Sequence, residues 1–224
     1  MSRRGALIAG LLWLVSAAMV RAEDMNSDWE AAFPIWAAPQ QVYFRAEYRD
    51  DLGRAHELQV WRQAELRLRR KTDQSIDLFV EKSQSGEYAY RLIDHDRKIL
   101  INADRTALYR IGVFSDWIGL AHVLNIPRGG YRIAESPRRL EPSRPGTCAW
   151  KRLERLTPRS SPSEICWSAR WGLPMEIGTD DEDGWKSRFS VKEVGTFAPS
   201  PEIFAVARES LFEIDAGQDP EVSD

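Results

Sequence analysis

The stretch from Ser163 to Phe197 constrains the fold more than any other part of the chain, because its apolar side chains fall on alternate positions. Alternation with a period of two is typical of strands in a sheet that has one buried face and one face in water. Turn signals interrupt it at Gly172 and at Asp180–Gly184. The stretch therefore predicts three antiparallel strands. The apolar residues that support this prediction are Ile165, Trp167, Ala169, Trp171, Leu173, Met175, Ile177, Trp185, Phe189 and Val191.

The same alternation runs through residues 42–111, where turn signals recur roughly every ten residues. No helical pattern in this part is long enough to connect parallel strands, so we predict an antiparallel meander. Its last strand is predicted at Ala107, Tyr109 and Ile111. Further strands are predicted at residues 131–134 and 147–156, and the latter is expected to pair with the strand that begins at Ile165.

Three segments have helical patterns. A short helix is predicted to end before Pro34, anchored by Trp29, Phe33 and Trp36. Residues 115–125 predict a second helix, since Ser115 can cap it and four apolar residues fall on one face, namely Trp117, Leu120, Ala121 and Leu124. Ser200 followed by Pro201 is a helix-start signal, and residues 203–212 are either a short helix or a final strand.

The first 22 residues are typical of a secretory signal peptide. Arg3 and Arg4 precede an apolar run, and Ala22 ends a segment that suits cleavage. We predict export to the periplasm and no transmembrane span after cleavage. Removing Arg3, Arg4 and Arg21 changes the formal charge from −3 to −6, so the mature chain lacks the basic excess of a nucleic-acid binder. The roughly 200 remaining residues fit one domain, followed by an acidic, apolar-poor tail that is predicted to be disordered.

Cys148 and Cys166 are the only cysteines. In an exported protein two such residues are expected to form a disulfide. The predicted hairpin across residues 157–162 would bring the two cysteines to a similar level on neighbouring strands. A redox role is less favoured, because the chain has no pair of cysteines separated by two residues.

Asp94, His95 and Asp96 form the one cluster that resembles a catalytic group, since carboxylates beside an imidazole can tune a general base. These residues are also what a tight turn between strands needs. His56 and His122 lie far away in sequence, and no spacing is typical of a metal site. We therefore expect no enzyme activity, no catalytic residue, no metal and no cofactor.

Basic residues gather in two places. The first group is Arg62, Arg67, Arg69, Arg70 and Lys71, and the second is Arg138, Arg139, Arg144, Lys151, Arg152, Arg155 and Arg159. The simpler interpretation is the wet face of the sheet with its loops. The alternative is a patch that attracts an anionic partner, such as a lipid head group or an acidic protein surface.

Several short motifs together resemble the bacterial outer-membrane lipoprotein-sorting proteins. The similar segments are the strand run from Val42 to Arg70, the hairpin from Asp94 to Leu100, Gly172-Leu173-Pro174, the turn Asp183-Gly184, the strand from Phe189 to Val194, and Ile203-Phe204. The resemblance spans roughly residues 40 to 206. It implies an incomplete antiparallel barrel whose concave face is covered by helices and encloses an apolar cavity for acyl chains. Some relatives would use the same shell to bind another protein.

The sequence and the resemblance together predict a mainly β, α+β protein. We expect a signal peptide at residues 1–22, a single-domain incomplete antiparallel β-barrel at residues 23–213 with short helices over its concave face, and a disordered tail at residues 214–224. The helix at residues 115–125 is the expected plug for the apolar face.

The leading functional hypothesis is a non-enzymatic periplasmic protein that holds a lipid or a lipoprotein acyl chain, as a carrier, chaperone or related sensor. The chain would be held by burial of apolar surface, after the helix has moved to admit it. The alternative is an envelope scaffold that binds another envelope protein and fills its core with its own side chains. The predicted ligand contacts are Phe44, Leu58, Leu68, Leu78, Tyr90, Trp117, Leu120, Leu124 and Trp167.

Overall fold

The computed structural model describes residues 28–110, 117–136, 138, 148–158, 160–182, 184–207 and 210–216. The predicted signal peptide lies outside the described residues, and so do Ile111, Ser115 and residues 217–224 of the predicted tail.

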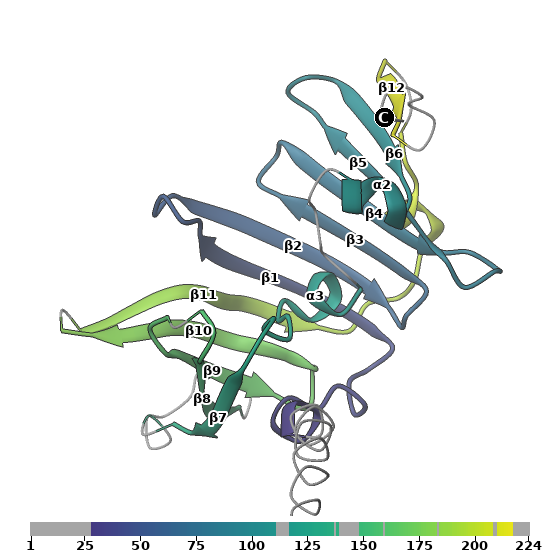
Figure 1. The fold of residues 1–224 in the computed structure, drawn as a ribbon. Helices are drawn as coiled ribbons and strands as arrows, with labels where there is room; N and C mark the ends of the chain where they lie inside the picture. The colour runs from purple at the N-terminus through teal and green to yellow at the C-terminus, as the bar shows by residue number, and fades with distance from the viewer. Residues whose placement is uncertain are drawn as a thin grey trace, which may run out of the picture.

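One sheet of twelve strands makes up most of the described chain (Figure 1). From edge to edge, the strands follow the order β12-β6-β5-β4-β3-β2-β1-β11-β10-β9-β8-β7. All neighbours are antiparallel except β12 and β6, which are parallel. The strands are β1 (Gln41–Arg49), β2 (Ala55–Gln63), β3 (Arg67–Thr72), β4 (Ile76–Lys82), β5 (Tyr88–Asp94), β6 (Ile99–Ala103), β7 (Tyr131–Glu135), β8 (Ala149–Arg155), β9 (Ser163–Ser168), β10 (Leu173–Asp181), β11 (Gly184–Gly195) and β12 (Phe212–Asp215).

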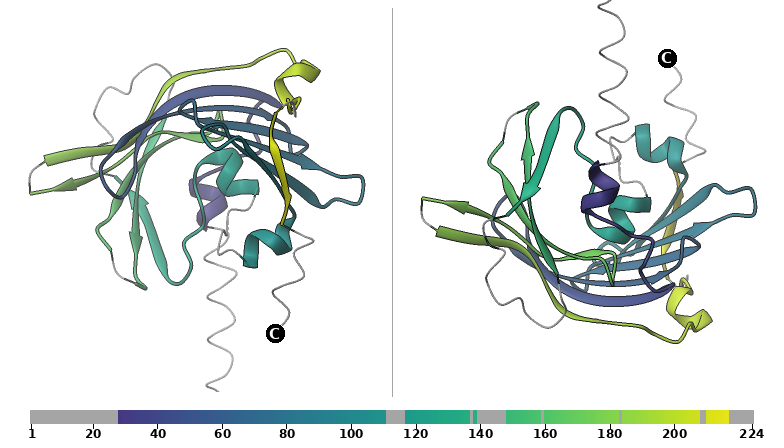
Figure 2. Two further views of the ribbon diagram at one scale, coloured as in Figure 1. Left: turned by 90° about the horizontal axis from the view of Figure 1, so that it is seen from above. Right: turned by 90° about the horizontal axis from the view of Figure 1, so that it is seen from below.

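The sheet curves into an open half-barrel (Figure 2). Its edge strands β7 and β12 do not pair with each other, so the described sheet does not close. Short helices lie inside the curve: a turn of helix at residues 28–32, α2 (Arg105–Arg110) and α3 (Trp117–His122). The predicted mainly β fold, an incomplete antiparallel barrel with helices over its concave face, is therefore confirmed.

The concave face carries the apolar positions that alternation predicted for the first strands. Phe44 of β1 lies opposite Val60 of β2, and Leu68 of β3 lies opposite Val80 of β4. All four are almost completely buried. Directly opposed residues share a face of a sheet, so these pairs form a continuous apolar floor.

Three register shifts interrupt the alternation in the stretch that first indicated the fold, and one of them lies between Pro174 and Glu176 where β10 pairs with β9. The pairing of β10 with β11 shifts between Ile177 and Gly178, and the pairing of β1 with β11 shifts between Arg45 and Ala46. One extra residue reverses which face the following side chains occupy. Phe189 lies opposite Ile177 on the concave side, whereas Trp185 packs edge-on against Trp150, 5.7 Å between ring centroids. The prediction that Trp185 and Phe189 share one face is therefore wrong.

The segment predicted as a strand at Ala107, Tyr109 and Ile111 is instead the helix α2, as far as it is described. The Asp104 carboxylate accepts a hydrogen bond from the backbone N–H of Ala107, at 2.7 Å. The Asp104 carbonyl accepts one from Leu108, at 3.1 Å. An aspartate in this position caps a helix, and the cap outweighs the alternation of three residues.

Several other boundaries differ from the sequence prediction. β9 ends at Ser168, so Ala169 and Trp171 lie in the turn to β10 and not in the strand. The helix start at Pro201 becomes the 3-10 helix η2 (Pro201–Phe204), and β12 follows it. β12 includes Ile214 and Asp215, which fall within the predicted disordered tail. Trp36 is 84% exposed and does not anchor the first helix.

The convex face is less open to water than predicted. Phe79, Ile93 and Leu100 form a small buried cluster there, covered by Val206 and Leu211 from the C-terminal segment. The Arg69 guanidinium pairs with the buried Asp77 carboxylate and donates to the Ile203 carbonyl, at 3.1 Å. The C-terminal segment is thereby held against the outside of the sheet before it reaches β12.

The predicted disulfide between Cys148 and Cys166 is present. Their Cα atoms are 5.4 Å apart, and the bond links the start of β8 to β9. Closing a loop between residues that are 18 positions apart removes conformational freedom from the unfolded chain. The disulfide therefore stabilises the β7–β9 side of the sheet.

The helix α3 offers a matched test of how the concave face is stabilised. Leu120 points into the core and is 6% exposed, whereas Ile118 on the same helix is 38% exposed. We expect Leu120→Ala to lower the free energy of unfolding by about 2–4 kcal/mol, because it removes buried methylenes and leaves a gap. Ile118→Ala should cost clearly less. Urea unfolding followed by circular dichroism measures both, and equal losses would contradict this account of the core.

Candidate functional site

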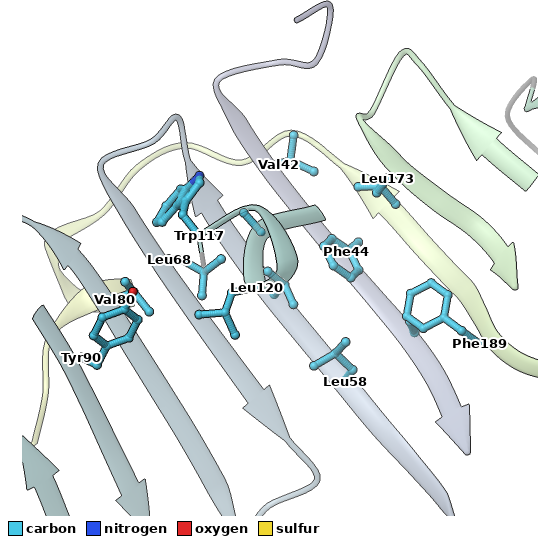
Figure 3. Packing of buried hydrophobic residues seen from close by; sticks show 13 residues of the cluster. Val42, Phe44, Leu58, Leu68, Val80, Tyr90, Trp117, Leu120, Leu173 and Phe189 are labelled. Atoms are coloured by element: carbon cyan, nitrogen blue, oxygen red, sulfur yellow. The ribbon is translucent and has the colours of Figure 1, made fainter. Parts of the chain in front are cut away.

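The concave face beneath α3 collects most of the residues predicted to contact a ligand (Figure 3). Phe44, Leu58, Leu68, Tyr90, Trp117 and Leu120 belong to one buried cluster, and Leu78 packs against it. They come from β1 to β5 and from α3, so alternation in the strands and periodicity in the helix placed them on facing surfaces.

The other two predicted residues lie in a second cluster on the β7–β9 side. Trp167 is buried there with Trp29 and Phe33 of the N-terminal helical segment, and Leu124 packs against the same group. The Trp167 indole N–H donates to the Pro34 carbonyl, at 3.1 Å. The segment around residues 28–34 thus covers this half of the concave face, as α3 covers the other.

We call α3 the lid of the concave face. In the described structure, side chains of α3 occupy the space over the apolar floor. Trp117 stacks on Tyr88 with ring centroids 5.1 Å apart, and Leu120 and Ala121 complete the packing. Phe44, Leu58 and Leu68 are 0% exposed as a result. A ligand could reach the floor only if α3 moved, so the role of these residues as ligand contacts stays a prediction.

A buried arginine connects α3 to the sheet. Arg62 of β2 is 3% exposed. Its Nη1 donates to the Ala121 carbonyl and its Nη2 to the Trp171 carbonyl, each at 3.1 Å. One side chain therefore joins β2, α3 and the turn before β10, which we call the Arg62 latch.

His122, the last residue of α3, completes the latch. Its Nδ1 lies 2.5 Å from the Gly172 carbonyl oxygen and 2.7 Å from Nη1 of Arg62. A neutral imidazole uses Nδ1 either to donate to Gly172 or to accept from Arg62. Gly172 has a φ of +62°, and a Cβ there would come within 2.9 Å of the Ala38 Cβ, so the close approach requires glycine.

The latch holds a positive charge that pairs with no carboxylate among the described residues. Burial lowers the pKa of Arg62 to about 10, which still leaves it charged at neutral pH. The pKa of His122 is lowered to about 4, first by burial and then by the Arg62 charge, against the opposing hydrogen bond to Gly172. His122 is therefore neutral at pH 7, and protonating it would place two positive charges side by side.

The alternation of residues in β2 predicts the inward position of Arg62, although this residue is grouped in the sequence with the basic residues that follow it. Leu58, Val60 and Arg62 stand on alternate positions, so period-two alternation already places Arg62 on the concave face with the other two. The same rule places Arg70 with Leu68, while Arg67 and Arg69 face outward. The first basic group is thus split between two faces and forms no single patch.

Asp94, His95 and Asp96 lie in the turn between β5 and β6. The Asp94 carboxylate accepts from the backbone N–H of Arg97, at 2.9 Å, as in an ordinary turn. The nearest carboxylate oxygen paired with His95 belongs to Asp77, 3.9 Å from Nε2. Whether the protein is an enzyme stays untested.

His56 lies at the tips of the strands, between two aspartates. Its Nδ1 is 2.8 Å from an Asp73 carboxylate oxygen, and its Nε2 is 3.4 Å from one of Asp50. The hydrogen bond to Asp73, and after it the one to Asp50, raises the pKa of His56. The contribution of His56 to stability is complete at low pH and is lost as the pH rises through its raised pKa. Within the described residues, no group of three or more histidine, cysteine or acidic side chains could hold a metal ion.

A groove of about 820 Å³ is lined by residues of the β1–β2 hairpin, β10 and β11. Tyr48 and Phe189 line it together with acidic and basic side chains of both signs. None of the nine predicted contact residues lines this groove, so it is a separate feature from the latched concave face.

Comparison with known proteins leaves the family open. No family model and no curated protein matches the sequence. Among solved structures, 39 chains match, and one of them is the crystal structure of MucB. It shares 14% identity and a TM-score of 0.41, over 83% of this chain and 64% of MucB, so the chain spans less than two thirds of that protein. Among the described residues, no helix is long and apolar enough to cross a membrane.

The latch makes stability depend on acidity in a defined direction. The ordinary pKa of histidine is 6.5 and that of His122 is about 4, so the unfolded chain takes up this proton first. The contribution is complete above pH 6.5 and falls between pH 6.5 and 4, by at most about 3 kcal/mol. His122→Asn should remove this part of the slope of unfolding free energy against pH.

A side chain that does not titrate provides the control. Urea titrations at intervals between pH 4 and 7 give the slope for each variant, and Ile118→Ala, on the exposed side of the same helix, should keep the slope of the unmodified protein. If His122→Asn keeps it as well, the buried imidazole does not titrate as described.

Proposed function

We propose that this protein binds a lipid or lipoprotein acyl chain between α3 and the concave face of its sheet. The observation that carries the proposal is the Arg62 latch: a short helix covers an apolar floor and is tied to it by hydrogen bonds to backbone carbonyls. A helix of six residues gains little stability of its own, so such contacts decide where it lies.

The free energy gained by burying an acyl chain is similar to the free energy lost when α3 leaves the floor. Burial contributes about 0.8 kcal/mol for each methylene, so ten buried methylenes contribute about 8 kcal/mol. Exposing Trp117 and Leu120 costs roughly 2–3 kcal/mol each, and the hydrogen bonds of the latch add about 1–3 kcal/mol each. The two sums are of similar size. An acyl chain could therefore displace α3 without holding it open irreversibly.

The predicted location of the protein in the cell supports this role. A disulfide is expected in an oxidising compartment, and the first 22 residues have the pattern of a signal peptide. We place the protein in the periplasm, where lipids and lipoproteins need a cover for their acyl chains during transit. We assign it no catalytic step, because Asp94, His95 and Asp96 serve a hairpin turn.

One observation favours the alternative of an envelope scaffold. The floor residues Phe44, Leu58 and Leu68 are fully buried by the protein's own lid. A core that is filled in this way needs no ligand, and the convex face or the groove near Tyr48 would then contact a partner protein. The two candidates differ in whether α3 ever leaves the floor.

Replacement of Trp117 in α3 distinguishes the acyl-chain binder from the scaffold. Trp117→Ala removes the side chain that competes with an acyl chain, so the fraction of lipid-bound protein should rise and the affinity should increase roughly tenfold. Native mass spectrometry of protein purified from the periplasm, followed by titration with a fluorescent fatty acid, measures both.

Trp185→Ala is the matched control, because Trp185 packs against Trp150 outside the floor cluster. It should leave lipid binding unchanged. Protein that is free of lipid in every variant, together with a stable partner recovered from the envelope, would favour the scaffold instead.

A further inference from the structure

A second arginine faces the concave side of the sheet, on the strand next to Arg62. Arg70 of β3 lies opposite Val60 of β2 and opposite Leu78 of β4. Leu68 precedes it on the same face, about 7 Å away along the strand. A guanidinium therefore stands inside an otherwise apolar part of the floor.

The side chain of Arg70 makes no hydrogen bond or ion pair with any described residue. This distinguishes it from the other arginines nearby: Arg62 donates to two carbonyls, and Arg69 pairs with Asp77. Arg70 is partly buried, and burial lowers its pKa, with a small opposing effect from Tyr48. The fold withdraws this charge from water, and no described residue provides a hydrogen-bond acceptor for it.

Such a group favours an anion with an apolar body. A guanidinium that has lost water regains hydrogen bonds when a carboxylate or phosphate docks against it, often through two parallel N–H···O bonds. The floor next to Arg70 accepts a hydrocarbon tail. The two properties lie side by side on one face.

We propose that Arg70 recognises the anionic head of an acyl ligand whose tail lies along the floor beneath α3. The inference rests on the proposed function and adds the class of ligand: an amphiphile with a carboxylate or phosphate at the end of its acyl chain. Neutral lipids of the same length would lack this contact. In the described structure Arg62 already has acceptors in the Ala121 and Trp171 carbonyls, so Arg70 is the guanidinium left to bind the head group.

Four probes separate head from tail. Oleate and monooleoyl phosphatidate carry an anion and a tail, oleyl alcohol carries the tail alone, and inorganic phosphate carries the anion alone. Displacement of a fluorescent fatty acid gives each affinity for the full-length exported protein and for its variants.

The unmodified protein should bind the two anionic lipids more tightly than oleyl alcohol and should bind inorganic phosphate far more weakly than any lipid. Whichever anionic lipid binds more tightly identifies the source of the head group. Arg70→Met keeps length and apolar contact but removes the charge, so it should weaken the anionic lipids roughly ten- to hundredfold. Oleyl alcohol should bind the variant at least as well as before.

Arg67→Met is the control, since Arg67 faces outward and pairs with Glu81. It should preserve the preference for anionic lipids. Arg70→Lys keeps the charge without the planar guanidinium. Its affinity for the anionic lipids should lie between that of the unmodified protein and that of Arg70→Met. Equal loss of oleate and oleyl alcohol in Arg70→Met, or no loss of either, would overturn the inference and leave the proposed function standing. Failure of the unmodified protein to bind any of the lipids would overturn both.

The ligand-free protein provides a second measurement. Because the Arg70 side chain has no partner among the described residues, Arg70→Met should leave the thermal midpoint unchanged or raise it. A fall of the size seen when a buried ion pair is broken would mean that Arg70 has a structural partner, and it would contradict the assignment.

Discussion

The structure depends on how one buried guanidinium is satisfied. Arg62 lies on the concave face and pairs with no carboxylate in the described part of the chain. Its charge is tolerated because two backbone carbonyls, from α3 and from the turn before β10, accept its hydrogen bonds. Withdrawing either acceptor would leave a desolvated charge. The helix, the turn and the sheet are therefore linked through one side chain. His122 tightens the link at neutral pH and opposes it when protonated.

The curved sheet creates the need for such a cover. A sheet of twelve strands with one apolar face must either close on itself or bury that face under other elements. Here short helical segments cover it in two parts, one around residues 28–34 and one at α3. Short segments that are held by tertiary contacts can leave without unfolding the sheet. A half-barrel of this kind suits a protein whose ligand replaces part of its own core.

Both inward arginines carry charge into this apolar space, and they differ in their partners. The Arg62 side chain donates to carbonyls of α3 and of the turn before β10, whereas the Arg70 side chain has no partner among the described residues. If a ligand enters under α3 as proposed, it would have one preferred orientation, with its tail toward α3 and its head group toward Arg70. Under that proposal, one strand would hold the helix and the neighbouring strand would bind the head group.

The sequence by itself determined the mainly antiparallel sheet, the apolar floor and the disulfide pair, because alternation and cysteine number are local or countable signals. It also contained the inward positions of Arg62 and Arg70, since each follows the alternation of its strand. Only the tertiary structure decided that Trp185 turns away from Phe189, because the bulges follow from the fit between neighbouring strands. Likewise, the segment around Ala107 is helical and not a strand because Asp104 caps α2. The latch itself joins residues 62, 122 and 172, which no local pattern connects.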